Sequence, residues 1–80
     1  MQKGYGPMLV EVENHRTVVK FMGKEHHYKD IGNIFADLRP DGLHVLGSEY
    51  SVELEKCVKL ARARKIPVEI NDPHLRALLT

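Results

Sequence analysis

The sequence contains one cysteine, no long apolar run and almost no net charge, and each of these features excludes a class of protein. The single cysteine, Cys57, excludes an internal disulfide framework and any zinc or iron–sulfur site built from several cysteines. Twelve basic and eleven acidic residues give a formal net charge of +1, so no strong field draws the chain to DNA or to a membrane. No apolar run approaches the roughly 20 residues that span a bilayer, and residues 1–4 begin no hydrophobic signal segment. We therefore expect a cytoplasmic protein without a membrane partner.

The remaining composition is that of a small globular domain. The 80 residues are 42% apolar and 29% charged, which argues against a disordered tail and leaves room for one core. Residues 1–6 contain two glycines and precede Pro7, so they are predicted to be a flexible leader. We expect residues 7–80 to form a single α/β domain.

The first third of that domain alternates apolar and polar residues with a period of two, which predicts a three-stranded antiparallel meander. The strands are expected at 8–13, 16–22 and 25–29, joined by turns at Asn14-His15 and Gly23-Lys24, the second of type II′. These turns place Val12 opposite Thr17 and Phe21 opposite His26. One face then collects Met8, Val10, Val12, Thr17, Val19, Phe21, His26 and Tyr28. The other, largely charged face collects Leu9, Glu11, Glu13, Arg16, Val18, Lys20, Met22, Glu25, His27 and Lys29.

The rest of the chain alternates helices and short strands. Residues 30–38 favour a short helix capped by Asp30, or an irregular segment, before a turn at 39–42 and a strand at 43–46. A longer helix is expected from Gly47-Ser48, capped by Ser48, up to Ile66-Pro67. A strand at 67–70 and a helix begun by Asp72-Pro73 complete the domain. The core stripe of the longer helix is predicted to be Tyr50, Leu54, Cys57, Val58 and Ala61.

These elements predict an α/β (α+β) fold with a small mixed sheet. The N-terminal meander is followed by a strand–helix–strand unit over 43–70, whose two strands form a parallel pair with a right-handed crossover. A C-terminal helix follows, and the helices cover one face of the sheet.

No pattern in the sequence indicates catalysis, a metal or a cofactor. The five histidines are scattered, and adjacent His26 and His27 would point to opposite faces of a strand. Cys57 falls in the apolar helical stripe, away from any general base. We expect no enzyme and no cofactor, and keep a small metal-binding protein or enzyme as the least favoured alternative.

One basic helix face provides the first candidate site. Lys56, Lys59 and Arg62 lie on the side of the longer helix opposite its apolar stripe, where they suit phosphate contacts with nucleic acid. The same residues also fit a solvated helix face that complements the helix dipole. Arg16 and Lys20 on the charged sheet face are the second choice, although glutamates interleave with them.

An apolar group on the charged sheet face provides the second candidate site. Leu9, Val18 and Met22 share that face and would form a small apolar patch if they were exposed together. The alternative function is therefore a protein-interaction or dimerisation module that uses this patch.

Three segments carry a resemblance to a known family: residues 23–35 (GKEHHYKDIGNIF), 43–48 (LHVLGS) and 61–78 (ARARKIPVEINDPHLRAL). In this order they resemble the large polyvalent protein-associated domains, accessory domains of conjugative relaxases, plasmid primases and related phage proteins. The resemblance covers about half of the chain, mainly 43–80, and rests largely on structural positions such as Gly32, Ser48 and Asp72-Pro73. It implies a non-enzymatic accessory module of mobile-element DNA processing. The expected partners are DNA, a protein partner or a parent multidomain protein.

Overall fold

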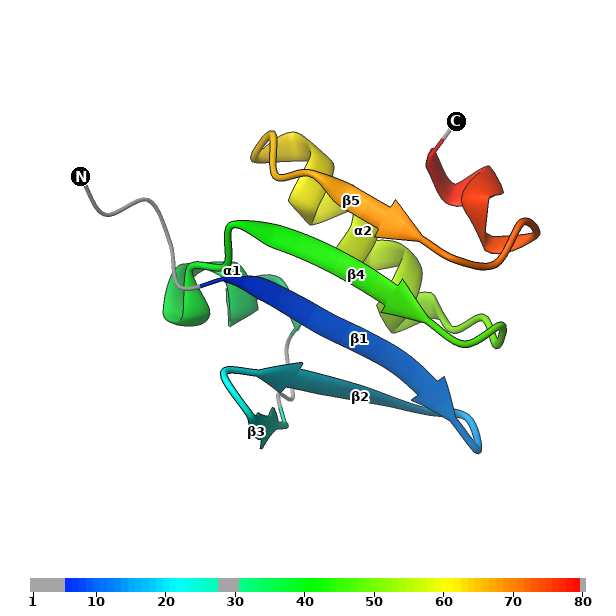
Figure 1. Cartoon of the computed structure of the whole chain (residues 1–80), viewed down its shortest axis with the longest axis horizontal. Helices are drawn as coiled ribbons and strands as arrows, with labels where there is room; N and C mark the ends of the chain where they lie inside the picture. The colour runs from blue at the N-terminus through cyan, green and yellow to red at the C-terminus, as the bar shows by residue number, and fades with distance from the viewer. Residues whose placement is uncertain (1–5, 28–30, 80) are drawn as a thin grey trace.

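A five-stranded mixed sheet, with α1 and α2 on one of its faces, forms the framework of the computed structural model, which describes residues 6–27 and 31–79 (Figure 1). The strands lie in the order β3-β2-β1-β4-β5. They are β1 (Pro7–Glu13), β2 (Arg16–Phe21), β3 (Lys24–His26), β4 (Gly42–Leu46) and β5 (Val68–Ile70). The helices are α1 (Ile34–Leu38) and α2 (Val52–Ala63), with 3₁₀ turns η1 (Ile31–Asn33) and η2 (Leu75–Leu79). The predicted fold class is confirmed, with the meander preceding the β4-α2-β5 unit.

The first hairpin has the predicted register. Val12 lies opposite Thr17 and Val10 opposite Val19 across antiparallel β1 and β2. Both turn residues, Asn14 and His15, have positive φ, as a two-residue turn of type I′ requires. Of the predicted leader, residues 1–5 lie outside the described residues.

The second turn lies one residue earlier than predicted. Met22 and Gly23 both have positive φ and form the turn, so Phe21 pairs with Lys24 and Val19 with His26. The predicted turn at Gly23-Lys24 and the pairing of Phe21 with His26 are therefore wrong. β3 is also shorter than expected, because it ends at His26, and Tyr28 lies outside the described residues. Relative to the predicted register, β3 is displaced by two residues along β2. Because side chains alternate between the faces with a period of two, His26 stays on the predicted face.

Two parallel pairings extend the hairpin into the full sheet. β4 pairs with β5 as predicted, and its other edge pairs with β1, so that β1 lies in the middle of the sheet. A buried row of Val19, Val10, Val45 and Ile70 crosses four strands. On the opposite face, the equivalent row is Glu25, Lys20, Leu9, His44 and Glu69.

Helix α2 begins later than predicted and ends in a well-defined C-terminal motif. Ser51 is the N-cap, because its Oγ accepts a hydrogen bond from the backbone N–H of Leu54 at 3.0 Å. Ser48 is therefore not the cap. At the other end, the N–H of Ile66 donates to the carbonyl of Ala61 and that of Lys65 to the carbonyl of Arg62. This is a Schellman motif, with Lys65 in the left-handed conformation at φ 60°.

The core lies between the sheet and the helices. Leu54, Cys57, Val58 and Ala61 of α2 are fully buried, which confirms four members of the predicted stripe. Tyr50 precedes the helix and is 49% exposed, so its predicted core position is wrong. The remaining buried hydrophobic residues are Met8, Val10, Val12, Val19, Phe21, Ile31, Ile34, Phe35, Leu43, Val45, Ile70 and Leu75.

The last segment closes over the edge of β5. Asp72 Oδ1 accepts hydrogen bonds from the backbone N–H groups of His74 and Leu75, which is the predicted capping role. The helix that follows is the 3₁₀ turn η2 rather than a regular α-helix. Arg76 Nε donates to the carbonyl of Ile70 at 3.0 Å and so occupies a backbone acceptor of β5. In the described parts of the chain, no helix is long and apolar enough to cross a membrane.

Candidate functional site

The predicted basic face lies on the outward side of α2. Lys56, Lys59 and Arg62 are exposed, and the buried stripe of the same helix faces the sheet. Val52 is 70% exposed on the same outward side, and a shallow, largely apolar hollow is lined by Val52, Glu55, Lys56, Lys59 and Leu60. The outward side of α2 therefore offers two lysines beside a narrow apolar surface.

Two of the three basic side chains already have partners within the chain. Lys59 Nζ lies 3.3 Å from Glu55 Oε2, one helical turn earlier, and Arg62 Nη1 donates to the carbonyl of Leu79. Tyr50 also donates its hydroxyl to Glu55. This hydrogen bond, followed by the Lys59 ammonium, lowers the pKa of the Glu55 carboxyl. Among the described residues, Lys56 has neither an ion pair nor a hydrogen bond and is available to a ligand.

The basic character of α2 increases toward its C-terminal end. The ten residues from Lys56 to Lys65 contain five basic residues and no acidic one: Lys56, Lys59, Arg62, Arg64 and Lys65. Arg64 at the C-cap lies over the ring of Phe35, 5.9 Å from its centroid, and Lys65 is exposed. The C-terminal half of α2 with its cap is thus the most cationic segment of the chain.

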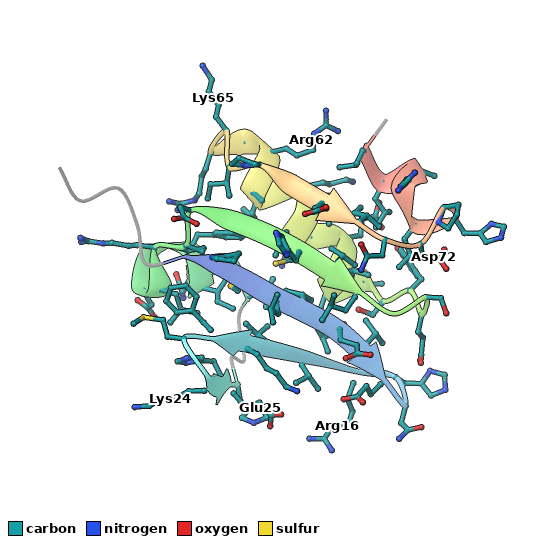
Figure 2. The ribbon with its side chains drawn as sticks, in the orientation of Figure 1. Arg16, Lys24, Glu25, Arg62, Lys65 and Asp72 are labelled. Carbon is teal, nitrogen blue, oxygen red and sulfur yellow. The ribbon has the colours of Figure 1, made fainter. Side chains whose placement is uncertain are left out.

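The second-choice residues, Arg16 and Lys20, do not join this basic surface. Figure 2 shows Arg62 and Lys65 at one margin of the molecule, and Arg16, Lys24 and Glu25 along the opposite margin. The strand register also places a glutamate opposite each of them, Glu13 opposite Arg16 and Glu25 opposite Lys20. The two groups of basic residues are therefore separate surfaces.

The uncovered face of the sheet holds two of the three predicted interface residues. Leu9 and Val18 lie there, half-buried, on neighbouring strands. Met22 belongs instead to the β2–β3 turn, where it is 67% exposed, so its predicted position on a strand is wrong. Leu9 and Met22 border one shallow hollow beside that turn, and Val18 does not.

Residues of β4 and β5 also belong to this face, which was not predicted from the sequence. His44 pairs with Leu9, Leu46 with Glu11, and Glu69 with His44. The sequence signal for this placement was the alternation within Gly42–Leu46. Leu43 and Val45 are buried in the core, whereas His44 and Leu46 are half-buried on the other face.

Histidines on the surface pair with glutamates. His44 Nε2 lies 3.2 Å from Glu69 Oε1, and His27 Nε2 lies 3.1 Å from Glu25 Oε1. His15 contacts Glu49 through both its ring and its backbone N–H. Within residues 6–27 and 31–79, no three histidine, cysteine or acidic side chains gather in a way that could hold a metal ion.

Comparisons with known proteins do not identify either surface. No protein-family model, no curated protein and no solved structure matches this chain. The candidate surfaces therefore remain the basic side of α2 and the uncovered sheet face.

Proposed function

We propose that this domain is a non-enzymatic accessory module of plasmid or phage DNA processing that contacts nucleic acid through α2. The observation that carries the proposal is the segment from Lys56 to Lys65, which contains five exposed basic residues and no acidic one. The resemblance of residues 43–80 to accessory domains of relaxases and primases supports the choice of nucleic acid.

The proposed contacts are to phosphates rather than to bases. Lys56 has no partner among the described residues, and Lys59 would exchange the carboxylate of Glu55 for a phosphate. Exposed ion pairs of this kind contribute at most about 1 kcal/mol, so the exchange costs little. Arg62 would contribute mainly charge, since its guanidinium is bound to the carbonyl of Leu79. Such contacts give salt-dependent binding with little sequence preference.

The uncovered sheet face suits nucleic acid less well. Its strand positions carry four glutamates, Glu11, Glu13, Glu25 and Glu69, against the two cations Arg16 and Lys20. This excess of negative charge would repel a phosphate backbone. We therefore assign the nucleic-acid contacts to the helix layer alone.

The test is a fluorescence-anisotropy titration of labelled single- and double-stranded DNA at two salt concentrations. The double variant K56E/K59E is expected to lose at least about tenfold in affinity. With double-stranded DNA, its slope of log affinity against log salt should fall by about 2, for two lost phosphate contacts. The matched control, R16E/K20E, makes the same charge change on the sheet face and should alter binding less than about threefold.

Three results would contradict the proposal: no binding by the unaltered domain at low salt, an equal loss in both double variants, or an unchanged salt slope in K56E/K59E. Circular dichroism of each variant would establish that α2 is still formed. Both altered lysines are exposed, so the fold should tolerate the change.

A further inference from the structure

Within residues 6–27 and 31–79, helices cover one face of the sheet and no element covers the other. Figure 1 shows α1 and α2 on the same side of the sheet, and the buried hydrophobic residues of the strands and helices form one core cluster. On the uncovered side, Leu9, Val18 and Leu46 are half-buried on three adjacent strands. Val18 and Leu46 lie directly on either side of Glu11, and Leu9 lies two residues before Glu11 on β1. These three residues form a central apolar triplet.

Four glutamates and two basic residues share the face with this apolar triplet, and Lys20 and His44 lie directly opposite Leu9 on the neighbouring strands. Glu11 lies between the members of the triplet and reaches toward Gly47, where a Cβ would lie 3.2 Å from Oε2. Among the described residues, Glu11 and Glu13 form no ion pair, although Arg16 lies opposite Glu13 across the strands, whereas Glu25 and Glu69 contact the imidazoles of His27 and His44. Two carboxylates that form no ion pair within the described residues thus lie next to an apolar surface on the uncovered face of the sheet.

This combination defines the partner by its charge and shape. We propose that the uncovered sheet face, centred on Leu9, Val18 and Leu46, docks a basic amphipathic helix of a protein partner. The apolar stripe of such a helix would cover the triplet, and its lysines or arginines would meet Glu11 and Glu13. The charges of the two surfaces are then complementary, which increases the rate of association and selects against acidic partners.

A helix fits this face better than the other candidate occupants. The opposite face is covered by α2, and a helix here would add a third layer, as in α/β folds whose sheets are covered on both sides. Nucleic acid is disfavoured by the four glutamates of the face. A second copy presenting its own uncovered face would bring two surfaces of the same sign together.

The experiment uses the ¹⁵N-labelled chain and two synthetic helical peptides that share one leucine stripe. The first peptide has lysines beside the stripe and the second has glutamates at the same positions. At low salt, the basic peptide should cause saturable amide shifts at Leu9, Val18 and Leu46, with affinity at least about tenfold above that of the acidic peptide. The proposal is overturned if the basic peptide gives no saturable shift, if both peptides bind equally, or if the shifts lie on α2.

Variants on opposite faces separate this site from non-specific attraction. V18T replaces an apolar group by a strand-compatible polar one, and E11Q removes one of the carboxylates without a cationic partner. Each should weaken binding of the basic peptide by about threefold or more. E53Q removes the same charge from α2, where Glu53 is exposed, and should have little effect. Equal losses in E11Q and E53Q would overturn the assignment.

Two further titrations test the competing occupants. If a short DNA duplex shifts the sheet-face amides, the occupant of this face is nucleic acid and not a partner helix. If the same amides shift when the chain alone is concentrated, the occupant is a second copy of the chain. This proposal is independent of the one for α2, because K56E/K59E should leave peptide binding by the sheet face largely unchanged. Either proposal can therefore fail without the other.

Discussion

Several residues other than glycine adopt positive φ, and Lys65 has the most clearly defined structural role. Left-handed backbone costs a residue with a Cβ about 1–2 kcal/mol, and glycine avoids this cost. Lys65 occupies the position after the C-cap of α2, where the Schellman hydrogen bonds to Ala61 and Arg62 require that conformation. The left-handed conformation at this position is therefore less favourable for lysine than it would be for glycine.

Replacing Lys65 by glycine should stabilise the fold. We expect Lys65→Gly to raise the free energy of unfolding by about 0.5–1 kcal/mol, because the left-handed position is relieved of its Cβ. Urea denaturation monitored by circular dichroism would measure the gain. Lys65→Ala keeps the Cβ and should bring no such gain, so equal stabilisation by both substitutions would assign the effect to the lost charge.

The N-terminus of α2 illustrates a choice between two similar sequence signals. Ser48 follows a glycine and precedes a run of helix-forming residues, so it fits the pattern of a cap. The structure uses Ser51, whose Oγ accepts from Leu54 and also lies 2.8 Å from Thr17 Oγ1 on β2. The bond to Thr17 comes from a distant strand, and no local pattern could have indicated it.

Ser51→Ala should destabilise the domain more than Ser48→Ala. Loss of the cap costs about 1 kcal/mol, and the hydroxyl of Thr17 also loses its partner. Ser48 is exposed and does not cap α2, so Ser48→Ala should change the stability by less than about 0.5 kcal/mol. Thermal unfolding of both variants gives the comparison, and similar destabilisation by the two would contradict the assignment of the cap.

The sequence predicted the faces of the meander better than its second turn. A turn at Gly23-Lys24 and a turn at Met22-Gly23 give β2–β3 registers that differ by two residues. Both registers therefore place His26 on the buried face. Alternation therefore could not distinguish them. The first hairpin was free of this ambiguity, and its register is confirmed.

The candidate surfaces differ in how far sequence could define them. The outward side of α2 follows from helical periodicity alone, so the exposure of Lys56, Lys59 and Arg62 was predictable. The uncovered sheet face depends on the parallel pairing of β1 with β4, which brings Leu46 beside Glu11. No local signal specifies that pairing, because residues 14–41 separate the two strands in the sequence.

At the scale of the whole molecule, Cys57 is the most deeply buried ionisable group among the residues that the structure describes. It is fully buried under the sheet, and burial raises the pKa of its thiol from an ordinary value of 9.0 to about 12. In the unfolded chain the thiol would lose its proton near pH 9, whereas in the folded chain it stays protonated. The stability from this difference is fully present below pH 9 and is lost as the pH rises toward about 12.

The stability of the unaltered chain should therefore fall more steeply above pH 9 than that of Cys57→Ala. The expected excess slope approaches about 1.4 kcal/mol per pH unit, the effect of one proton. Denaturation at several pH values between 8 and about 11 measures the slope of stability against pH for both proteins. Lysine and tyrosine side chains titrate in both proteins, so their contribution cancels in the comparison. Parallel slopes would show that water reaches the thiol in the folded state.

The central position of β1 in the sheet has a consequence for how this chain folds and aggregates. Its contacts with β2 close across a short turn, whereas those with β4 wait until the intervening chain has been ordered, which carries a larger loop-closure entropy. An early or damaged state can therefore retain the hairpin and lack β4. In that state β1 is a free edge with Met8, Val10 and Val12 uncovered, a template on which other chains can add strands. Weakening β4 should therefore promote aggregation as well as unfolding.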